Sequence, residues 1–550
     1  MHVCVGKTRS ILGLKLIQLE EFSSGKSKEL QQLAFDVIRP WLQQCDADHP
    51  CECGGLKHVE HLKSFVTIST ERELPTLPTR VIDVGIESNS QTKLHISQPG
   101  ERGRYLTLSY RWGEGNDAAM TTAHNIAARV EQIDVASLPN TIKDAIDVTR
   151  AMGIAYIWID ALCIIQATYG STGDVSDPGD FKDEAYKMST YYGNSYCTIA
   201  ATAAENTAQG FVQSRKDDVF ADSCTLSPWL IQGARQRIVR VGPGLPRWKS
   251  DVKEASMYKR AWILQERALS TRVLHWGRGA LWWECPHQRA SEFLPRDAIS
   301  VSFDQNQPYM QPDRWLAESS SMSDLWRSWT DLIREYSAMD LGRESDRLIA
   351  LQGLVDVVSQ RFTGEIYLFG LWKSHLPQSL CWEVSERRQV DEPIIPCKAP
   401  SWSWAACPHP VMYMYPPTHP RAELVMYDSS SGSDFQCRLR IKGLLEKAPF
   451  GKRRIVREYD DGRRYKTKNY FLHFDSCPLE SPQMLNIDLF LLATFDWDTP
   501  TNGHCATHFL LLEPVEHYPN HYRRIGSAMR WTKRIDWKGR NFEEVDIYLV

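Results

Sequence analysis

Four potential metal ligands lie close together near the start of the 550-residue chain: Cys45, His49, Cys51 and Cys53. Zinc favours tetrahedral sets of cysteine and histidine side chains, and this segment supplies the right atoms. However, Cys51 and Cys53 are closer than the usual zinc-binding pair, and no second pair follows at finger spacing. Two interpretations therefore stay open, a zinc site or reduced thiols in a loop at a helix end.

A second candidate is an acidic residue inside an apolar segment. Asp160 interrupts the run AYIWIDALCII (residues 155–165), which is typical of a buried parallel strand. A carboxylate there caps a helix or bonds to backbone, or it is kept for function, because burying it without a partner is costly. Open α/β sheets bind ligands at the carboxyl ends of their strands, which makes Asp160 a candidate site residue.

The common catalytic motifs are absent from the sequence. It contains no GxxxxGK[ST] phosphate loop, no GxGxxG after a strand, no HExxH and no GxSxG. The most frequent motif-based assignments of enzymatic function therefore have no support here.

Charge and composition narrow the class of protein. Lys and Arg total 64 against 68 for Asp and Glu, so the chain lacks the basic excess of a nucleic-acid binder or a polybasic membrane anchor. No stretch approaches the roughly 18 apolar residues of a membrane span, and basic residues interrupt the N-terminus in a way unlike a signal peptide. Fourteen cysteines are sparse, which fits a reducing compartment. We expect a soluble, cytoplasmic, multi-domain protein with no nucleic-acid partner and no membrane span.

The candidate residues need a framework, and hydrophobic periodicity supplies one. Residues 1–76 are expected to be helical, because leucines and isoleucines recur there near a spacing of 3.6. Residues 77–295 alternate strands, such as YLTLSY at 105–110, with helices. One helix is expected to start near Thr141, with Asp144 completing a capping box, and to end at Gly153. This alternation predicts an α/β domain with a parallel sheet.

The remaining chain changes character twice. Residues 296–410 are predicted to be helical and mixed, whereas residues 411–550 hold short apolar runs separated by turn-rich pieces. That pattern favours an antiparallel β-rich region.

Four ordered segments carry a resemblance to a known family. They are YLTLSYRWG (105–113), LPNTIKDAIDVTRAMGIAYIWIDALCIIQ (138–166), KMSTYYGNSYCTIAATAAENTAQGF (187–211) and KRAWILQERALSTRVLHWGRGALWWEC (259–285). In that order they resemble the fungal heterokaryon incompatibility (HET) domain. The segments LPTRVIDVG before them and DRLIALQGL, LFGLW and PSWSWA after them are similar to the context of such domains.

The resemblance implies a role in fungal non-self recognition, in which HET-domain proteins trigger growth arrest or programmed cell death. It also implies a distant similarity to TIR domains, with a flavodoxin-like α/β fold and self-association, and another incompatibility protein as a possible partner. Some TIR domains cleave NAD⁺ with a glutamate, so NAD⁺ is a possible substrate and no cofactor is required. The alternative is a non-catalytic module that oligomerises and recruits partners.

The same resemblance ranks the candidate site residues. A carboxylate near the anomeric carbon stabilises the oxocarbenium-like state of glycosidic cleavage. Glu184 occupies a position where HET sequences commonly carry Glu, so it ranks first as the catalytic acid, with Asp160 second. Glu266 is a lower-ranked alternative. The segment Ser109, Tyr110, Arg111 and Trp112 is similar to a TIR strand-to-loop piece and is expected to bind the nucleotide, Arg111 through a phosphate. The competing interpretations are a solvated ion pair for Glu184 and ordinary core or surface roles for the others.

Overall fold

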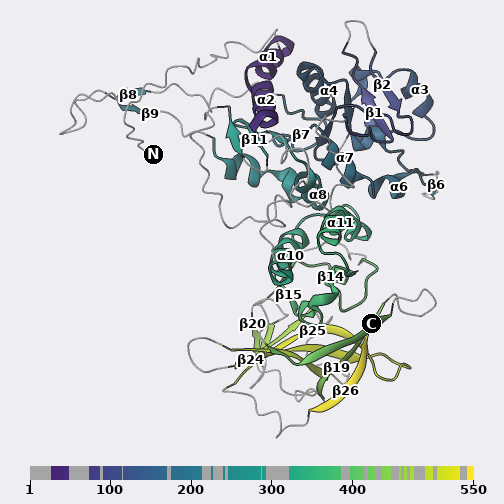
Figure 1. Ribbon diagram of the computed structural model, residues 1–550, viewed down its shortest axis with the longest axis vertical. Coiled ribbons are helices and arrows are strands. Elements are labelled where there is room, and N and C mark those ends of the chain that lie inside the picture. The colour runs from purple at the N-terminus through teal and green to yellow at the C-terminus, as the bar shows by residue number, and fades with distance from the viewer. Residues whose placement is uncertain are drawn as a thin grey trace. The chain divides into compact units, whose positions relative to one another are not determined.

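The structure is a computed structural model of the 550-residue chain, and its helices and strands are shown in Figure 1. It describes residues 26–48, 74–86, 91–113, 115–169, 175–212, 224–226, 239–241, 246–285, 288–292, 321–385, 397–413, 419–428, 437–447, 457–459, 464–466, 471–475, 490–498, 505–532 and 542–550. The chain divides into two compact units, Met1–Gln307 and Pro308–Val550, and each is described by itself.

The first unit is built around a mixed sheet with helices. Its helices are α1 (Lys26–Leu33), α2 (Arg39–Asp48), α3 (Ile126–Glu131), α4 (Asn140–Met152), α5 (Asp160–Cys163), α6 (Phe181–Ala185), α7 (Met188–Asn194) and α8 (Ala261–Leu269). Its strands are β1 (Arg80–Asp83), β2 (Lys93–Ile96), β3 (Tyr105–Ser109), β4 (Tyr156–Trp158), β5 (Thr168–Tyr169), β6 (Val175–Asp177), β7 (Cys197–Ala200), β8 (Cys224–Leu226), β9 (Val239–Val241), β10 (Val273–Trp276), β11 (Leu281–Glu284) and β12 (Arg289–Ser291). The expected α/β core is therefore present in this part of the chain.

Eight of these strands form one sheet in the order β12-β11-β10-β7-β3-β4-β1-β2. The four central strands β10, β7, β3 and β4 run parallel, and the outer strands on both sides are antiparallel. Ser109 pairs with Ala200 in register, so the carboxyl ends of β3 and β7 lie level at one edge. Every residue of β3 is buried, as expected for a strand covered on both faces.

Helices cover the sheet according to the direction of the connections. The chain moves from β3 to β4 in one direction and from β4 to β7 and β10 in the other. Right-handed crossovers then place α4 on one face and α7 and α8 on the opposite face. In agreement, α7 packs against α8, whereas α1 packs against α4 (Figure 1).

Two details of the predicted elements differ from the structure. The apolar run at residues 155–165 forms only the short strand β4, because Asp160 accepts a hydrogen bond of 2.7 Å from the Ala161 backbone and opens α5. The helix α4 ends at Gly153 in the left-handed conformation as predicted, but Pro139 takes the N-cap position and no side chain caps it. Asp144 instead accepts hydrogen bonds from the backbone of Phe211 and Val212, so the predicted capping box is wrong.

In its described residues, the second unit contains two longer helices and a large β-sheet. Its helices are α10 (Met322–Ser337) and α11 (Gln352–Arg361), and its short strands are β13 (Tyr367–Leu368), β14 (Leu371–Trp372), β15 (Trp382–Val384) and β16 (Val411–Tyr413). The sheet is formed by β17 (His419–Pro420), β18 (Ala422–Asp428), β19 (Arg438–Lys447), β20 (Arg457–Tyr459), β21 (Arg464–Lys466), β22 (Phe471–Phe474), β23 (Phe490–Asp498), β24 (Cys505–Pro514), β25 (His521–Thr532) and β26 (Glu543–Leu549).

The predicted β-rich C-terminal region is therefore present. Strand pairing runs from β19 through β26, β25, β24 and β23 back to β19, so these five strands close on themselves. The pairing is antiparallel as predicted, except between β25 and β26, which run parallel. Phe474, Leu491, Phe509 and Leu511 share a buried core cluster of this sheet.

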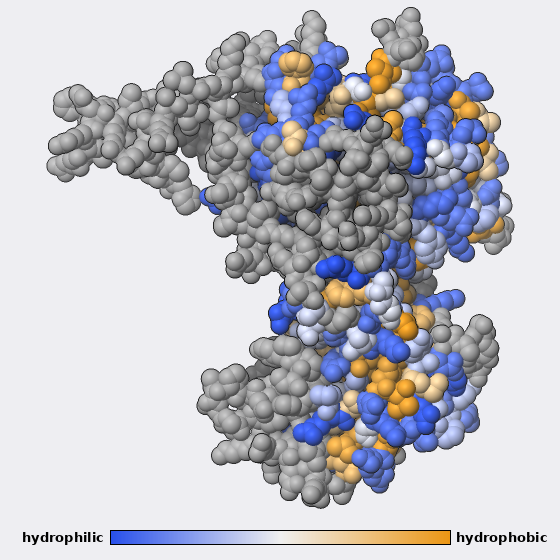
Figure 2. Space-filling model, in the orientation of Figure 1, coloured by the Kyte–Doolittle hydropathy of each residue, from blue (hydrophilic) through white to orange (hydrophobic). Residues whose placement is uncertain are grey.

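On the face shown in Figure 2, hydrophilic residues cover most of the described surface of each unit, and apolar residues occur there in small groups. Among the helices of the described residues, we find none with the length and apolar character needed to cross a bilayer.

Candidate functional site

The carboxyl edge of the parallel strands joins two polar side chains from distant parts of the first unit. Ser109, the last residue of β3, donates a hydrogen bond of 2.5 Å from Oγ to Oε2 of Glu266 on α8. Both are deeply buried, with 2% and 5% of their surfaces exposed. A buried carboxyl group requires such a donor, because an unpaired one is costly. This edge is also where sheets of this kind place their ligands.

A second carboxyl group follows the neighbouring strand β4. Asp160 Oδ2 accepts a hydrogen bond of 2.8 Å from the indole nitrogen of Trp112, and Oδ1 accepts from the Ala161 backbone. Asp160 and Trp112 are partly exposed, in contrast to Ser109 and Glu266. Asp160 therefore lies nearer to solvent than Glu266.

An arginine and a tyrosine complete the group. Arg260, the residue before α8, donates a hydrogen bond of 2.9 Å from Nη1 to the backbone oxygen of Tyr110. Its positive charge lowers the pKa of both Asp160 and Glu266, so all three side chains lie within electrostatic reach of one another. We call Ser109, Tyr110, Trp112, Asp160, Arg260 and Glu266 the carboxylate cluster.

Burial sets the acidity of the two carboxyl groups. Burial, together with the charge of Asp160, raises the pKa of Glu266 to about 7, against the opposing effects of the Ser109 hydrogen bond and of Arg260. Burial also raises the pKa of Asp160, and Arg260 and the donors around the carboxylate oppose this. A carboxyl group that exchanges its proton near pH 7 is suited to general acid–base chemistry.

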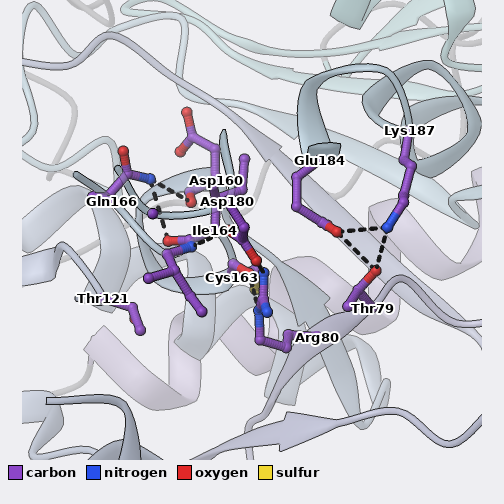
Figure 3. Close-up of polar contacts among 12 residues, drawn as sticks. Thr79, Arg80, Thr121, Asp160, Cys163, Ile164, Gln166, Asp180, Glu184 and Lys187 are labelled. Carbon is purple, nitrogen blue, oxygen red and sulfur yellow. Dashed lines mark hydrogen bonds and ion pairs between the residues drawn. The ribbon is translucent and has the colours of Figure 1, made fainter. Parts of the chain in front are cut away.

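Glu184 lies in a different set of contacts. Its Oε1 accepts hydrogen bonds of 3.0 Å from Thr79 Oγ1 and 2.8 Å from Lys187 Nζ, and its Oε2 accepts one of 2.8 Å from the Tyr191 hydroxyl. Figure 3 shows the Glu184 carboxylate directed toward Thr79 and Lys187. The side chain is 2% exposed and ties α6 to the residue before β1.

The connection that precedes Glu184 is also anchored by charged groups. Arg80 donates to the backbone oxygen of Cys163 at 2.6 Å and to Asp180 Oδ2 at 2.5 Å (Figure 3). Asp180 Oδ1 in turn accepts from the Ile165 backbone at 2.7 Å. The stretch between Gln166 and Glu184, which contains the strand pair β5 and β6, is thus closed at its base.

The structure separates the sequence-predicted residues into two groups. Ser109, Tyr110, Trp112 and Asp160 come together in the carboxylate cluster, whereas Glu184 contacts none of them in a described interaction. Arg111 is exposed, and its backbone oxygen accepts from Thr207 Oγ1 at 3.3 Å.

Two members of the cluster were not leading candidates from the sequence. Glu266 ranked below Glu184 and Asp160, and Arg260 was given no role. One sequence signal pointed to Glu266. It is an acidic residue in AWILQERAL, and α8 buries all of its residues except the partly exposed Trp262.

The predicted metal site falls mostly outside the described residues, which exclude His49, Cys51 and Cys53. Cys45 is buried on α2, and its thiol lies beside Arg272. Within the described ranges, no group of three or more His, Cys, Asp or Glu side chains is placed to hold a metal ion.

Comparison with known proteins gives the family of this region. Residues 105–266 match the family model described as heterokaryon incompatibility protein (HET). No curated protein and no solved structure matches the chain. The matched region begins with the first residue of β3 and ends at Glu266, so it includes both partners of the Ser109–Glu266 hydrogen bond. Residues 105–266 are therefore similar to the heterokaryon incompatibility (HET) family.

Proposed function

We propose that this protein is a cytoplasmic effector of fungal non-self recognition whose HET domain hydrolyses NAD⁺, and that loss of NAD⁺ causes growth arrest or cell death. The observation that carries the proposal is the carboxylate cluster, in which Ser109 binds Glu266, Asp160 lies within electrostatic reach of Glu266, and burial raises the pKa of both carboxyl groups. Pairs of acidic groups in unlike environments are a common basis of acid–base catalysis.

The two carboxyl groups suit two roles in the cleavage. Water replaces nicotinamide at the anomeric carbon of the ribose, giving ADP-ribose and a proton. We assign to Asp160, the more exposed group, the stabilisation of the positive charge that develops on the ribose. Glu266, with a pKa of about 7, accepts the proton of the attacking water. Nicotinamide leaves as a neutral molecule and needs no proton.

The strand order supports the TIR-like part of the proposal. Numbered along the chain, the four parallel strands lie in the order 2-1-3-4, which is that of flavodoxin-like sheets. In such sheets, ligands bind at the carboxyl edge where the strand order reverses. That edge contains the carboxylate cluster.

The test is nicotinamide release from NAD⁺ by the purified full-length protein at high concentration, with folding checked by circular dichroism. Glu266→Gln and Asp160→Asn keep the shape of each side chain and remove its charge, so we expect each to lower the rate by about 100-fold or more. Glu184→Gln is the matched control, because it changes an equally buried carboxylate in the same domain. Loss of activity in Glu184→Gln alone would instead identify Glu184 as the catalytic acid, which is the residue that ranks first from the sequence.

Self-association through the HET domain is part of the proposal, so assembly is measured beside activity. Light scattering on the same samples reports whether the protein oligomerises. Assembled wild-type protein that releases no nicotinamide would refute hydrolysis. It would favour the alternative function, a non-catalytic module that recruits partners, among them another incompatibility protein.

A further inference from the structure

Arg260 has more hydrogen-bond donors than the protein uses. A guanidinium group carries five N–H donors and no acceptor. In the part of the chain that the structure describes, the Arg260 side chain makes one hydrogen bond, to the backbone oxygen of Tyr110, and no ion pair. The side chain is partly exposed, so the remaining donors stand at the boundary between the carboxylate cluster and solvent.

Three other arginines of the first unit each bind a carboxylate group. Arg267 makes a bidentate contact with Glu284, at 2.8 and 2.9 Å. Arg80 binds Asp180 and a backbone oxygen, and Arg272 binds Asp46 at 2.6 Å. In each case a carboxylate neutralises the cation within hydrogen-bond distance. Arg260 lacks such a partner, although its charge acts on Asp160 and Glu266.

The backbone around Arg260 is held in place. The Arg260 amide donates to the oxygen of Met257 at 3.1 Å, and the Arg260 oxygen accepts from Ile263 at 3.2 Å in the first turn of α8. Tyr110, which holds the guanidinium, is followed by the exposed Arg111, a second cation on the same loop. The arrangement thus presents a planar donor group whose backbone is fixed and whose guanidinium is held by one hydrogen bond.

We propose that Arg260 forms an anion subsite of the carboxylate cluster, and that it binds a phosphate group of a nucleotide ligand. Arginine is well matched to this task, because its planar fork binds two phosphate oxygens at once. The partly exposed Trp112 binds Asp160 within the same cluster, and an indole ring can stack on a base. The ligand class is therefore a phosphorylated nucleoside.

This inference rests on the proposed position of the functional site but not on catalysis there. AMP is the appropriate probe, because it carries a phosphate and a base but no nicotinamide that could be cleaved. Adenosine is the matched ligand without phosphate. Binding of both to the full-length protein is measured by isothermal titration calorimetry at low and high salt.

The variants are Arg260→Gln, Arg260→Lys and the control Arg39→Gln. Arg39, the first residue of α2, is also partly exposed. Its side chain donates to one backbone oxygen, that of Ala151 at 3.1 Å, which lies near the end of α4 and not in the carboxylate cluster. We expect Arg260→Gln to weaken AMP binding about tenfold or more, Arg260→Lys to weaken it less, and Arg39→Gln to leave it unchanged. Adenosine should bind all four proteins alike.

Three results would overturn the subsite. The first is that the wild-type protein does not bind AMP at millimolar concentration. The second is that a folded Arg260→Gln protein binds AMP as the wild type does, and the third is that Arg260→Gln loses AMP and adenosine binding equally. The outcome is independent of the proposed reaction. AMP binding that depends on Arg260, together with no release of nicotinamide from NAD⁺, would leave the subsite standing and remove the hydrolase.

Discussion

Glu266 is a carboxyl group that the fold makes hard to ionise. Its side chain is almost completely buried, its nearest donor is the neutral hydroxyl of Ser109, and Asp160 adds negative charge nearby. Arg260 offsets only part of this cost. Since burial raises the pKa of Glu266 from 4.5 to about 7, the folded state holds a proton on this residue that the unfolded state has already lost.

The residue therefore makes the domain less stable as the pH rises. Between pH 4.5 and 7 the folded state binds more protons than the unfolded state, so this contribution to stability is complete below pH 4.5 and lost through pH 7. Glu266→Gln should remove the trend, and its stability relative to the wild type should increase from pH 5 to pH 8 by on the order of 3 kcal/mol. Thermal unfolding at a series of pH values measures this.

Ser109→Ala provides an internal control for that experiment. It removes a donor that lowers the pKa of Glu266, so it should move the midpoint of the pH trend upward without abolishing it. A wild-type and a Glu266→Gln protein with parallel pH profiles would contradict the assignment of the trend to Glu266.

At the residue scale, the sequence predicted which residues are site candidates better than it predicted which of them are in contact. The segment Ser109–Trp112 and Asp160 follow neighbouring strands, and the rule that strand ends meet at one edge is enough to bring them together. Glu184 and Glu266 both lie on helices near that edge, and sequence spacing does not say which acid faces Ser109. The answer depends on tertiary contacts. Thr79, Lys187 and Tyr191 surround Glu184, and Ser109 binds Glu266.

At the scale of elements, α8 is held to the sheet by a buried charged network. Arg267, next to Glu266, pairs with Glu284 on β11, which also binds Arg289 and His275. Burial alone would raise the pKa of Glu284, but the two arginines and His275 hold it well below its usual range. Burial lowers the pKa of His275 to about 4, so the imidazole is neutral at pH 7. The network positions the helix that carries Glu266.

We expect Glu284→Ala to destabilise the first unit by about 3 to 5 kcal/mol, because it leaves two cations in the interior without their carboxylate. Glu254→Ala is the control. Glu254 pairs with Lys249 at 3.7 Å with both side chains more than half exposed, so its loss should cost less than about 1 kcal/mol. Chemical denaturation compares the two, and equal effects would show that the network is not a major source of stability.

A glycine in the connection to α6 gives a second prediction at this scale. Gly179 has a φ of +62°, and a Cβ atom there would overlap the backbone oxygen of Ile165. Gly100 has a φ of +80° but no atom within 4 Å of such a Cβ. Both Gly→Ala variants share the backbone strain, so Gly179→Ala should lower the thermal midpoint clearly more than Gly100→Ala. Similar midpoints would mean that the connection adapts to the added methyl group.

The elements themselves were predicted where a local signal exists. The helix α4 has an apolar face and ends at a glycine, and β3 and β7 are short apolar strands. The apolar run at residues 155–165 was predicted to be one buried strand. This was wrong because periodicity does not distinguish such a strand from a strand followed by a short buried helix. The sheet order and the parallel pair β25–β26 depend on long-range contacts that no local pattern encodes.

At the scale of the whole molecule, each of the two units has its own buried core. We expect two calorimetric unfolding transitions. Arg524 in the second unit pairs with Asp475 at 2.8 Å and stacks on Trp382, so Arg524→Ala should lower one transition by on the order of 10 °C. Glu284→Ala should lower the other. A single transition, or both transitions moving in each variant, would contradict independent unfolding.

The bond between Ser109 and Glu266 also has a consequence for the chain during its synthesis. The two residues are 157 positions apart. At typical translation rates of about 5 to 20 residues per second, Ser109 is synthesised roughly 8 to 31 s before its glutamate partner. A growing chain therefore lacks Glu266 throughout that interval, and the Ser109–Glu266 hydrogen bond can form only after α8 has been translated and has folded onto the sheet.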